Sequence, residues 1–201
     1  AGTDAALAMA MGHVLLKEFF VDRRTPFFVD YVRTYTDLPF LVRLDEHDQG
    51  GLVPGKFLTA TDLGATAPED AWKTVLLDGA SGRAVVPNGS MGFRYADSGK
   101  GRWNLDLEGV SPALTMAGEG SEPVEVLLPA FADPSGSGSV LHRGVPARRV
   151  DGHLVTTVFD LMLAQYGVER VLDGQSLPGE WPTGYDDATT PYTPAWQAEI
   201  T

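Results

Sequence analysis

The residues best suited to binding chemistry lie at the start of the sequence, where Gly2, Thr3 and Asp4 precede an apolar helical run. Glycine lets the backbone approach a ligand closely, and the first N–H groups of a helix point toward an anion or a polar ligand. The Asp4 carboxylate repels phosphate and suits a ribose or a base, from which it can accept hydrogen bonds. An ordinary helix start capped by Thr3 or Asp4 is the simpler interpretation of the residues alone.

The sequence contains no self-contained catalytic motif. Asn88-Gly89-Ser90-Met91-Gly92 is rich in glycine but does not match the nucleophile elbow Gly-x-Ser-x-Gly. Neither Gly-x-Gly-x-x-Gly nor a Walker loop occurs. The acidic pairs at 45–46 and 186–187 are of a kind common on protein surfaces. We therefore predict no catalytic residue in this chain.

Metal-ligand patterns are weak as well. The four histidines form no His-x-x-x-His pair, and the absence of cysteine excludes disulfides and thiolate ligands for zinc or iron–sulfur clusters. The densest polar cluster, Asp45-Glu46-His47-Asp48, precedes Gly50-Gly51, which is typical of a solvated turn. We predict no metal ligand.

Charge and hydropathy exclude several classes of partner. The net charge of −12 argues against nucleic acid and against anionic membrane surfaces. The longest apolar stretch, Ala5–Leu16, is shorter than the roughly 20 residues of a membrane span, and no basic segment precedes it as in a signal peptide. The four tryptophans do not alternate with basic residues, so we expect them to pack against the core or against further protein; they are Trp72, Trp103, Trp181 and Trp196.

Periodicity predicts a mixed α/β chain, α+β in arrangement, with helices at both ends and a β-rich middle. We divide it into a helical part at 1–37, a β-rich part with loops at 38–150, and a helix with an irregular C-terminal part at 151–201. All three read as one internal fragment of a larger subunit, because both ends suggest more protein.

The first helix is apolar nearly all round. Leu7, Met11 and Leu15 share one side, and Leu16 lies on another. A helix of this kind is a buried helix, so we expect further protein to cover it, and an exposed apolar patch or self-association if the chain is isolated. At the other end, Thr193-Pro194 begins another helix only a few residues before the sequence stops.

Local signals predict the remaining elements. Thr157 and Asp160 fit the acidic variant of the capping box and begin a helix that Gly167 ends. The others are a second helix from Thr25-Pro26 to Tyr35, strands at 38–44, 52–58 and 124–128, hairpins that pair 73–77 with 83–86 and 91–95 with 102–107, loops at 118–123 and 133–139, and an irregular segment at 176–191.

A collinear set of motifs resembles the alpha (catalytic) subunit of bacterial membrane-bound respiratory nitrate reductases, in the molybdopterin oxidoreductase family. The opening stretch is similar to a segment that recurs across that family, and the later ones narrow the likeness to the alpha subunit. They are Gly2–Leu7, Ala10–Val14, Tyr31–Arg33, Tyr35–Asp37, Trp72–Thr74, Val86–Arg94, Trp103–Leu105, Leu154–Val158, Asp160-Leu161, Tyr166–Arg170, Tyr185–Asp187 and Tyr192–Trp196.

The resemblance implies a large enzyme at the cytoplasmic side of the membrane that reduces nitrate to nitrite. It implies two molybdopterin guanine dinucleotides around one molybdenum, with electrons from an iron–sulfur beta subunit and a membrane cytochrome subunit. The family's aspartate ligand to molybdenum and its own iron–sulfur ligands belong to N-terminal parts absent here, so we expect no tightly bound cofactor in this chain alone. It places the opening loop, Gly2, Thr3 and Asp4, close to a guanine dinucleotide.

Two alternatives stay open at this point. The chain could be a non-catalytic module whose β-rich middle docks a partner subunit, which the acidic balance and the tryptophans would suit. It could also belong to a related molybdenum oxidoreductase that acts on another oxyanion, because no residue in this sequence identifies the substrate.

Overall fold

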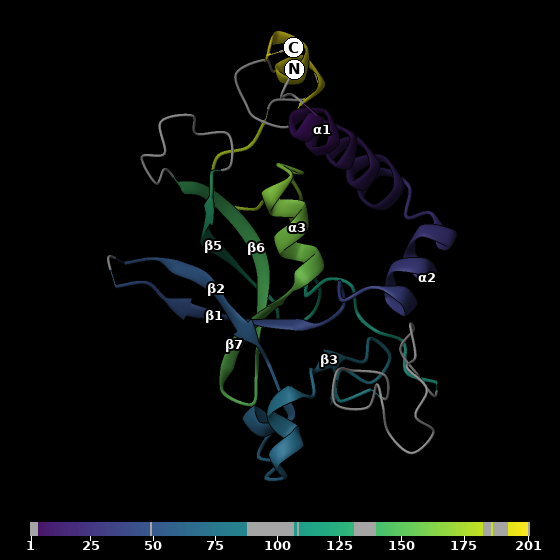
Figure 1. Ribbon diagram of the computed structural model, residues 1–201, viewed down its shortest axis with the longest axis vertical. Coiled ribbons are helices and arrows are strands. Elements are labelled where there is room, and N and C mark those ends of the chain that lie inside the picture. Colours follow the sequence, from purple (N-terminus) through teal and green to yellow (C-terminus); the bar gives the residue numbers. More distant parts are fainter. Residues whose placement is uncertain are drawn as a thin grey trace.

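A closed five-stranded barrel flanked by helices is the centre of the described part of the chain (Figure 1). The structure is a computed structural model and describes residues 4–48, 50–87, 107, 109–130, 140–182, 186 and 193–200. Its elements are α1 (Asp4–Leu16), the π-helix η1 (Lys17–Asp22), α2 (Pro26–Tyr35), β1 (Leu41–Glu46), β2 (Leu52–Phe57), the 3-10 helices η2 (Ala60–Leu63) and η3 (Pro68–Trp72), β3 (Leu76–Leu77), β4 (Ala84–Val85), β5 (Glu122–Pro129), β6 (Val140–Val150), β7 (His153–Thr157), α3 (Val158–Gln165), β8 (Val171–Leu172), β9 (Gln175–Ser176) and α4 (Pro194–Ile200). The mixed α/β class predicted from the sequence is confirmed.

The barrel has the strand order β1-β2-β5-β6-β7 and closes where β7 pairs with β1. The strands predicted at 38–44 and 52–58 are confirmed as β1 and β2, which pair antiparallel. The predicted solvated turn begins later than expected: Asp45 and Glu46 are exposed but belong to the end of β1, and His47 and Asp48 are the exposed turn residues. Only β2 and β5 run parallel, joined at Leu52 and Val126. Closure leaves these strands without the free edges that invite aggregation.

The longest strand, β6, and its partner β7 are not among the predicted strands. Pro146 and Gly144 lie in the middle of β6, and both residue types argue against a strand interior. The structure explains Gly144, because a Cβ there would lie 2.5 Å from the Pro178 carbonyl oxygen, so glycine admits the crossing segment. At Pro146 the carbonyl accepts from the Thr156 hydroxyl over 2.8 Å.

Helix α3 covers the barrel and joins its core to the helical part. A buried cluster connects three barrel strands to α3 through Leu44, Val126, Leu128, Val145, Ala147 and Ala164. A second cluster connects the opposite face of α3 to the N-terminal helices through Leu16, Phe20, Val32, Phe159 and Leu163. Helix α3 is thus the element through which the barrel positions α1.

The small hairpin expected at 73–77 and 83–86 is confirmed by the short pair β3 and β4. Its turn is held by Asp78, whose carboxylate accepts from the Ser81 hydroxyl at 2.6 Å and from the Ser111 backbone N–H at 3.1 Å. These hydrogen bonds, that of Ser81 above all, lower the pKa of Asp78 to about 2. The hairpin predicted at 91–95 and 102–107 lies outside the described residues, apart from Leu107.

Helix α1 packs by one face only. Ala10, His13 and Leu16 are buried, whereas Leu7, Met11 and Leu15 form an exposed row. The expected burial on all sides is therefore not achieved by the described residues, and the exposed apolar patch predicted for the isolated chain is present. No helix in the described part of the chain is both long and apolar enough to span a bilayer.

Candidate functional site

Asp4, the member of the predicted binding loop that the structure describes, is the first residue of α1 and is exposed. Gly2 and Thr3 lie outside the described residues. Helix α4 lies beside this end of α1, so both ends of the chain meet there (Figure 1). Its predicted cap is formed, since the Thr193 hydroxyl accepts from the Trp196 backbone N–H at 3.1 Å. The exposed first turn of α1 is the candidate ligand-facing surface.

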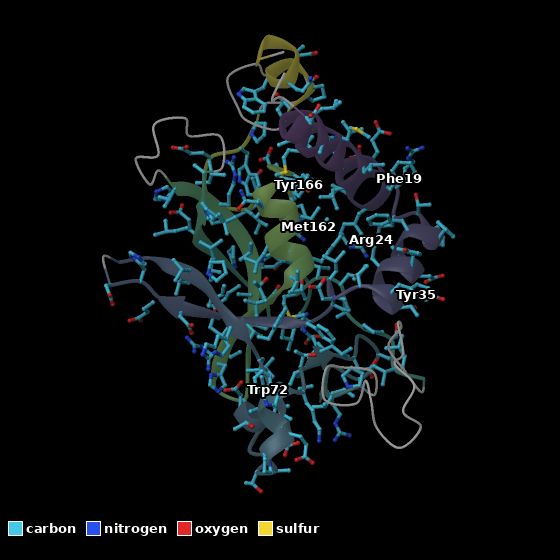
Figure 2. All side chains as sticks on the ribbon, in the orientation of Figure 1. Phe19, Arg24, Tyr35, Trp72, Met162 and Tyr166 are labelled. Carbon is cyan, nitrogen blue, oxygen red and sulfur yellow. The ribbon has the colours of Figure 1, made fainter. Side chains whose placement is uncertain are left out.

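Close contact with Tyr166 fixes α1 on the end of α3. A Cβ at Gly12 would lie 2.1 Å from Tyr166 Cε1, so only glycine lets the ring rest against the helix backbone. His13 Nδ1 lies 2.7 Å from the Tyr166 carbonyl oxygen. Figure 2 shows Tyr166 at the α3 end that faces α1.

Aromatic packing completes the attachment beyond this contact. The rings of Phe20 and Phe159 meet edge to face with 4.5 Å between their centroids. Leu16 packs in the same buried cluster. Buried aromatic pairs of this kind contribute about 0.5–1.5 kcal/mol beyond the area they bury. The position of the α1 start is thus set by the barrel through α3.

The His13 contact should make this attachment sensitive to pH. Burial, the largest cause, lowers the pKa of His13 below its ordinary value of 6.5, the hydrogen bond that His13 donates to the Tyr166 carbonyl raises it, and nearby Lys17 lowers it further. A lowered pKa means that the unfolded chain binds a proton more readily than the folded chain. The stability that neutral His13 contributes to the folded chain is complete above pH 6.5 and is lost as the pH falls through the pKa of His13 in the folded state.

We expect the free energy of unfolding, measured with urea, to fall between pH 7.5 and pH 5 by more in the wild-type chain than in a His13→Asn variant, because only the wild-type chain carries an imidazole whose pKa is lowered by folding. Asparagine keeps a donor for the Tyr166 carbonyl but does not titrate. Protonation of carboxylates changes the stability of both proteins equally, so the difference between the two falls in stability reports on His13 alone. Equal falls in the two proteins would contradict the assignment.

A buried ion pair ties α3 to two neighbouring segments. Asp160 is fully buried, and its Oδ1 lies 2.7 Å from Arg170 Nη1. The alignment falls outside hydrogen-bonding geometry, so charge attraction dominates this contact. The other oxygen, Oδ2, accepts from the Met116 backbone N–H at 2.8 Å. Arg170 Nη1 also donates to the Thr115 hydroxyl at 3.1 Å.

The expected acidic capping box is therefore only half correct. The Thr157 hydroxyl accepts from the Asp160 backbone N–H at 2.9 Å, as a helix cap should. The Asp160 carboxylate does not return to Thr157 but faces Met116 and Arg170 instead. Arg170 follows Asp160 by ten residues, and no local pattern relates them, so the sequence alone does not reveal this pair.

The arrangement supports positioning and offers no catalytic group. The buried polar residues around α3 are engaged in packing, capping or the ion pair. No group of three or more histidine, cysteine or acidic side chains is arranged for a metal ion among the residues that the structure describes. The exposed start of α1 is therefore the best candidate for ligand contact, with the barrel and α3 as its support.

Comparisons with known proteins identify relatives along the whole chain. It is 56% identical over 206 residues to the nitrate reductase alpha subunit of Mycobacterium tuberculosis and 43% identical over 224 residues to the respiratory nitrate reductase 1 alpha chain of Escherichia coli. Each match covers 100% of this chain, but the chain spans only about 16–17% of the length of these relatives.

A weaker match, 35% identical over 91 residues, is to the perchlorate reductase subunit alpha of Dechloromonas aromatica and covers 45% of this chain and 8% of that protein. No protein-family model matches the chain. The alignment of every residue with nitrate reductase alpha subunits confirms the resemblance inferred from the motifs: the chain corresponds to one segment of such a subunit.

Proposed function

We propose that this chain is a framework segment of the catalytic subunit of a molybdenum enzyme that reduces nitrate to nitrite in anaerobic respiration. The observation that carries the proposal is the match of the entire chain to nitrate reductase alpha subunits at 43% and 56% identity. The segment spans about 16% of such a subunit, and because no catalytic residue is predicted in it, we assign the chemistry to the remainder.

In this proposal the start of α1 contributes to the binding region of a molybdopterin guanine dinucleotide through Gly2, Thr3 and Asp4. The chemistry of Asp4 fits the guanine or ribose part of that group, because an exposed carboxylate accepts hydrogen bonds from N–H and O–H donors. It does not fit the pyrophosphate part, which it would repel. When bound, the cofactor supplies the two-electron reduction of nitrate, and the residues of this chain supply position.

The partners proposed are the rest of the alpha subunit, an iron–sulfur beta subunit and a membrane cytochrome subunit, with the assembly at the cytoplasmic side of the membrane. The exposed apolar row Leu7, Met11 and Leu15 supports contact with further protein, because monomers rarely expose contiguous apolar surface. Self-association of the isolated chain through the same row remains a prediction.

Replacing Asp4 with alanine in the complete subunit should weaken retention of the guanine dinucleotide by about ten- to hundredfold, since hydrogen bonds to a charged group contribute roughly 1.5–3 kcal/mol. Molybdopterin and GMP released from the purified variant measure this directly. Asp30→Ala, which removes an exposed acid from α2, is the matched control and should keep the wild-type content. Unchanged cofactor content in Asp4→Ala would refute the assignment of Asp4.

A second substrate has one specific observation in its favour, the partial match to a perchlorate reductase subunit. That match covers less than half of the chain, whereas the nitrate reductase matches cover all of it. Nitrate is therefore the proposed substrate, and turnover with perchlorate but not with nitrate would reverse the choice.

A further inference from the structure

An open pocket of about 720 Å³ lies between the β1–β2 hairpin, η3 and the first turns of α3. Phe57, Trp72 and Leu161 contribute apolar wall, and Arg43 and Lys56 contribute positive charge. We call it the Trp72 pocket. Its volume is in the range of sites that enclose a ligand or inserted side chains. Figure 2 shows Trp72 far from α1, so this pocket is separate from the candidate site above.

The Trp72 side chain is unusually exposed for a tryptophan. It is 66% exposed, although tryptophan usually buries most of its large apolar ring. Of the two alternatives expected for the tryptophans, packing against the core does not apply to Trp72, and packing against further protein stays a prediction. An exposed aromatic ring beside an apolar hollow is typical of a surface that other protein covers.

Two polar atoms of the pocket residues are buried and have no hydrogen-bond partner among the described residues. They are the hydroxyl of Thr74, which is 4% exposed, and Nε of Arg43. The other Arg43 nitrogens are engaged, with Nη1 at 3.3 Å from Asp62 and Nη2 at 3.9 Å from Asp45. Buried polar groups are nearly always paired. Arg43 Nε can only donate, whereas the Thr74 hydroxyl can donate or accept, so an acceptor is the group that would serve both atoms.

The charge of the pocket also indicates a negatively charged acceptor. Lys56 is exposed and forms no ion pair with any residue that the structure describes. Arg43 already faces the carboxylates of Asp62 and Asp45, so Lys56 is the lining cation left without an opposing acid among the described residues. The Asp62 carboxylate is already occupied by the backbone N–H and the hydroxyl of Thr59, at 2.8 and 2.9 Å. A carboxylate is the complementary group.

We propose that the Trp72 pocket receives a segment of the same subunit, from outside these 201 residues, that places an apolar side chain against Trp72 and a carboxylate beside Lys56 and Arg43. This rests on the proposed function, since the relatives extend the chain about sixfold and so provide most of the surface available to cover it. The carboxylate or a neighbouring carbonyl also accepts from Thr74.

Zero-length carbodiimide cross-linking of the complete purified enzyme, followed by peptide mass spectrometry, tests the proposal. The Lys56 amine should be joined to an aspartate or glutamate of the same subunit outside this segment. Lys56→Arg keeps the charge but cannot react, so that cross-linked peptide should vanish from the variant. The pair of Lys17 and Asp22, 2.8 Å apart, provides an internal control that the reagent has acted.

Oxidation of tryptophan is the second measurement. Trp72 should be oxidised at least about tenfold more slowly in the native enzyme than in the denatured enzyme, as expected for a protected site. Joining of Lys56 to a different subunit, a small molecule released from the pocket, or free oxidation of Trp72 in the native enzyme would each overturn the proposal. An enzyme that gives the expected cross-link but does not reduce nitrate would refute the proposed function and leave the pocket assignment intact.

Discussion

Replacing Asp160 with alanine should lower the free energy of unfolding of the chain by about 3–5 kcal/mol, the usual cost of removing one partner from a buried ion pair. The guanidinium of Arg170, only 9% exposed, loses the carboxylate 2.7 Å away. The Met116 backbone N–H loses its acceptor as well. Urea unfolding followed by circular dichroism measures the loss.

Two further variants separate charge from hydrogen bonding. Asp160→Asn retains an acceptor for Met116 and should lose less than Asp160→Ala. Replacing both Asp160 and Arg170 with leucine should restore part of the stability, because a pair replaced by apolar residues is often tolerated. A double replacement that is less stable than Asp160→Ala would contradict the view that the unpaired Arg170 charge causes the loss.

Gly12→Leu should separate α1 from α3 and lower the free energy of unfolding by about 1–3 kcal/mol, the typical cost of overpacking. The added Cβ would lie 2.1 Å from Tyr166 Cε1, and the rest of the side chain has no space. In the complete subunit the displaced helix start should also bind less guanine dinucleotide. Thermal unfolding and GMP content measure the two effects.

Ala8→Leu is the matched control, because Ala8 lies exposed one turn earlier on the same helix. Its effect should stay within about 0.5 kcal/mol, as for most surface substitutions. Combining Gly12→Leu with Tyr166→Ala should recover stability relative to Gly12→Leu, since the obstructing ring is gone. Equal stability of Ala8→Leu and Gly12→Leu would show that Tyr166 moves aside at no cost.

Local signals identified most of the elements because caps and turns are encoded in a few adjacent residues. Thr157 does cap α3, and Pro194 does begin α4. Barrel closure could not be predicted in this way, because it depends on contacts between distant segments, such as the parallel pairing of Leu52 with Val126. Strand β6 is not predicted because Gly144 argues against a strand, and the reason for a glycine there is the segment that crosses it, which the sequence does not show.

The candidate site shows the same limit. Asp4 could be named from the sequence because a helix start and a family motif coincide there. The residues that hold α1 in place, Gly12 and Tyr166, are far apart in the sequence and are paired only by the fold. The ion pair of Asp160 and Arg170 also could not be predicted from the sequence, because an acidic residue at position 160 is equally expected for capping the helix.

The central claim, that this segment is framework for a molybdenum enzyme and does no chemistry alone, is tested most directly by one comparison. Molybdenum, GMP content and nitrate reduction should be measured on the isolated 201-residue chain and on the complete subunit purified with its partners. We expect molybdenum, GMP and nitrate reduction in the complete enzyme and none of them in the isolated chain. Bound cofactor or turnover in the isolated chain, or a complete enzyme that holds molybdenum but leaves nitrate unchanged, would contradict it.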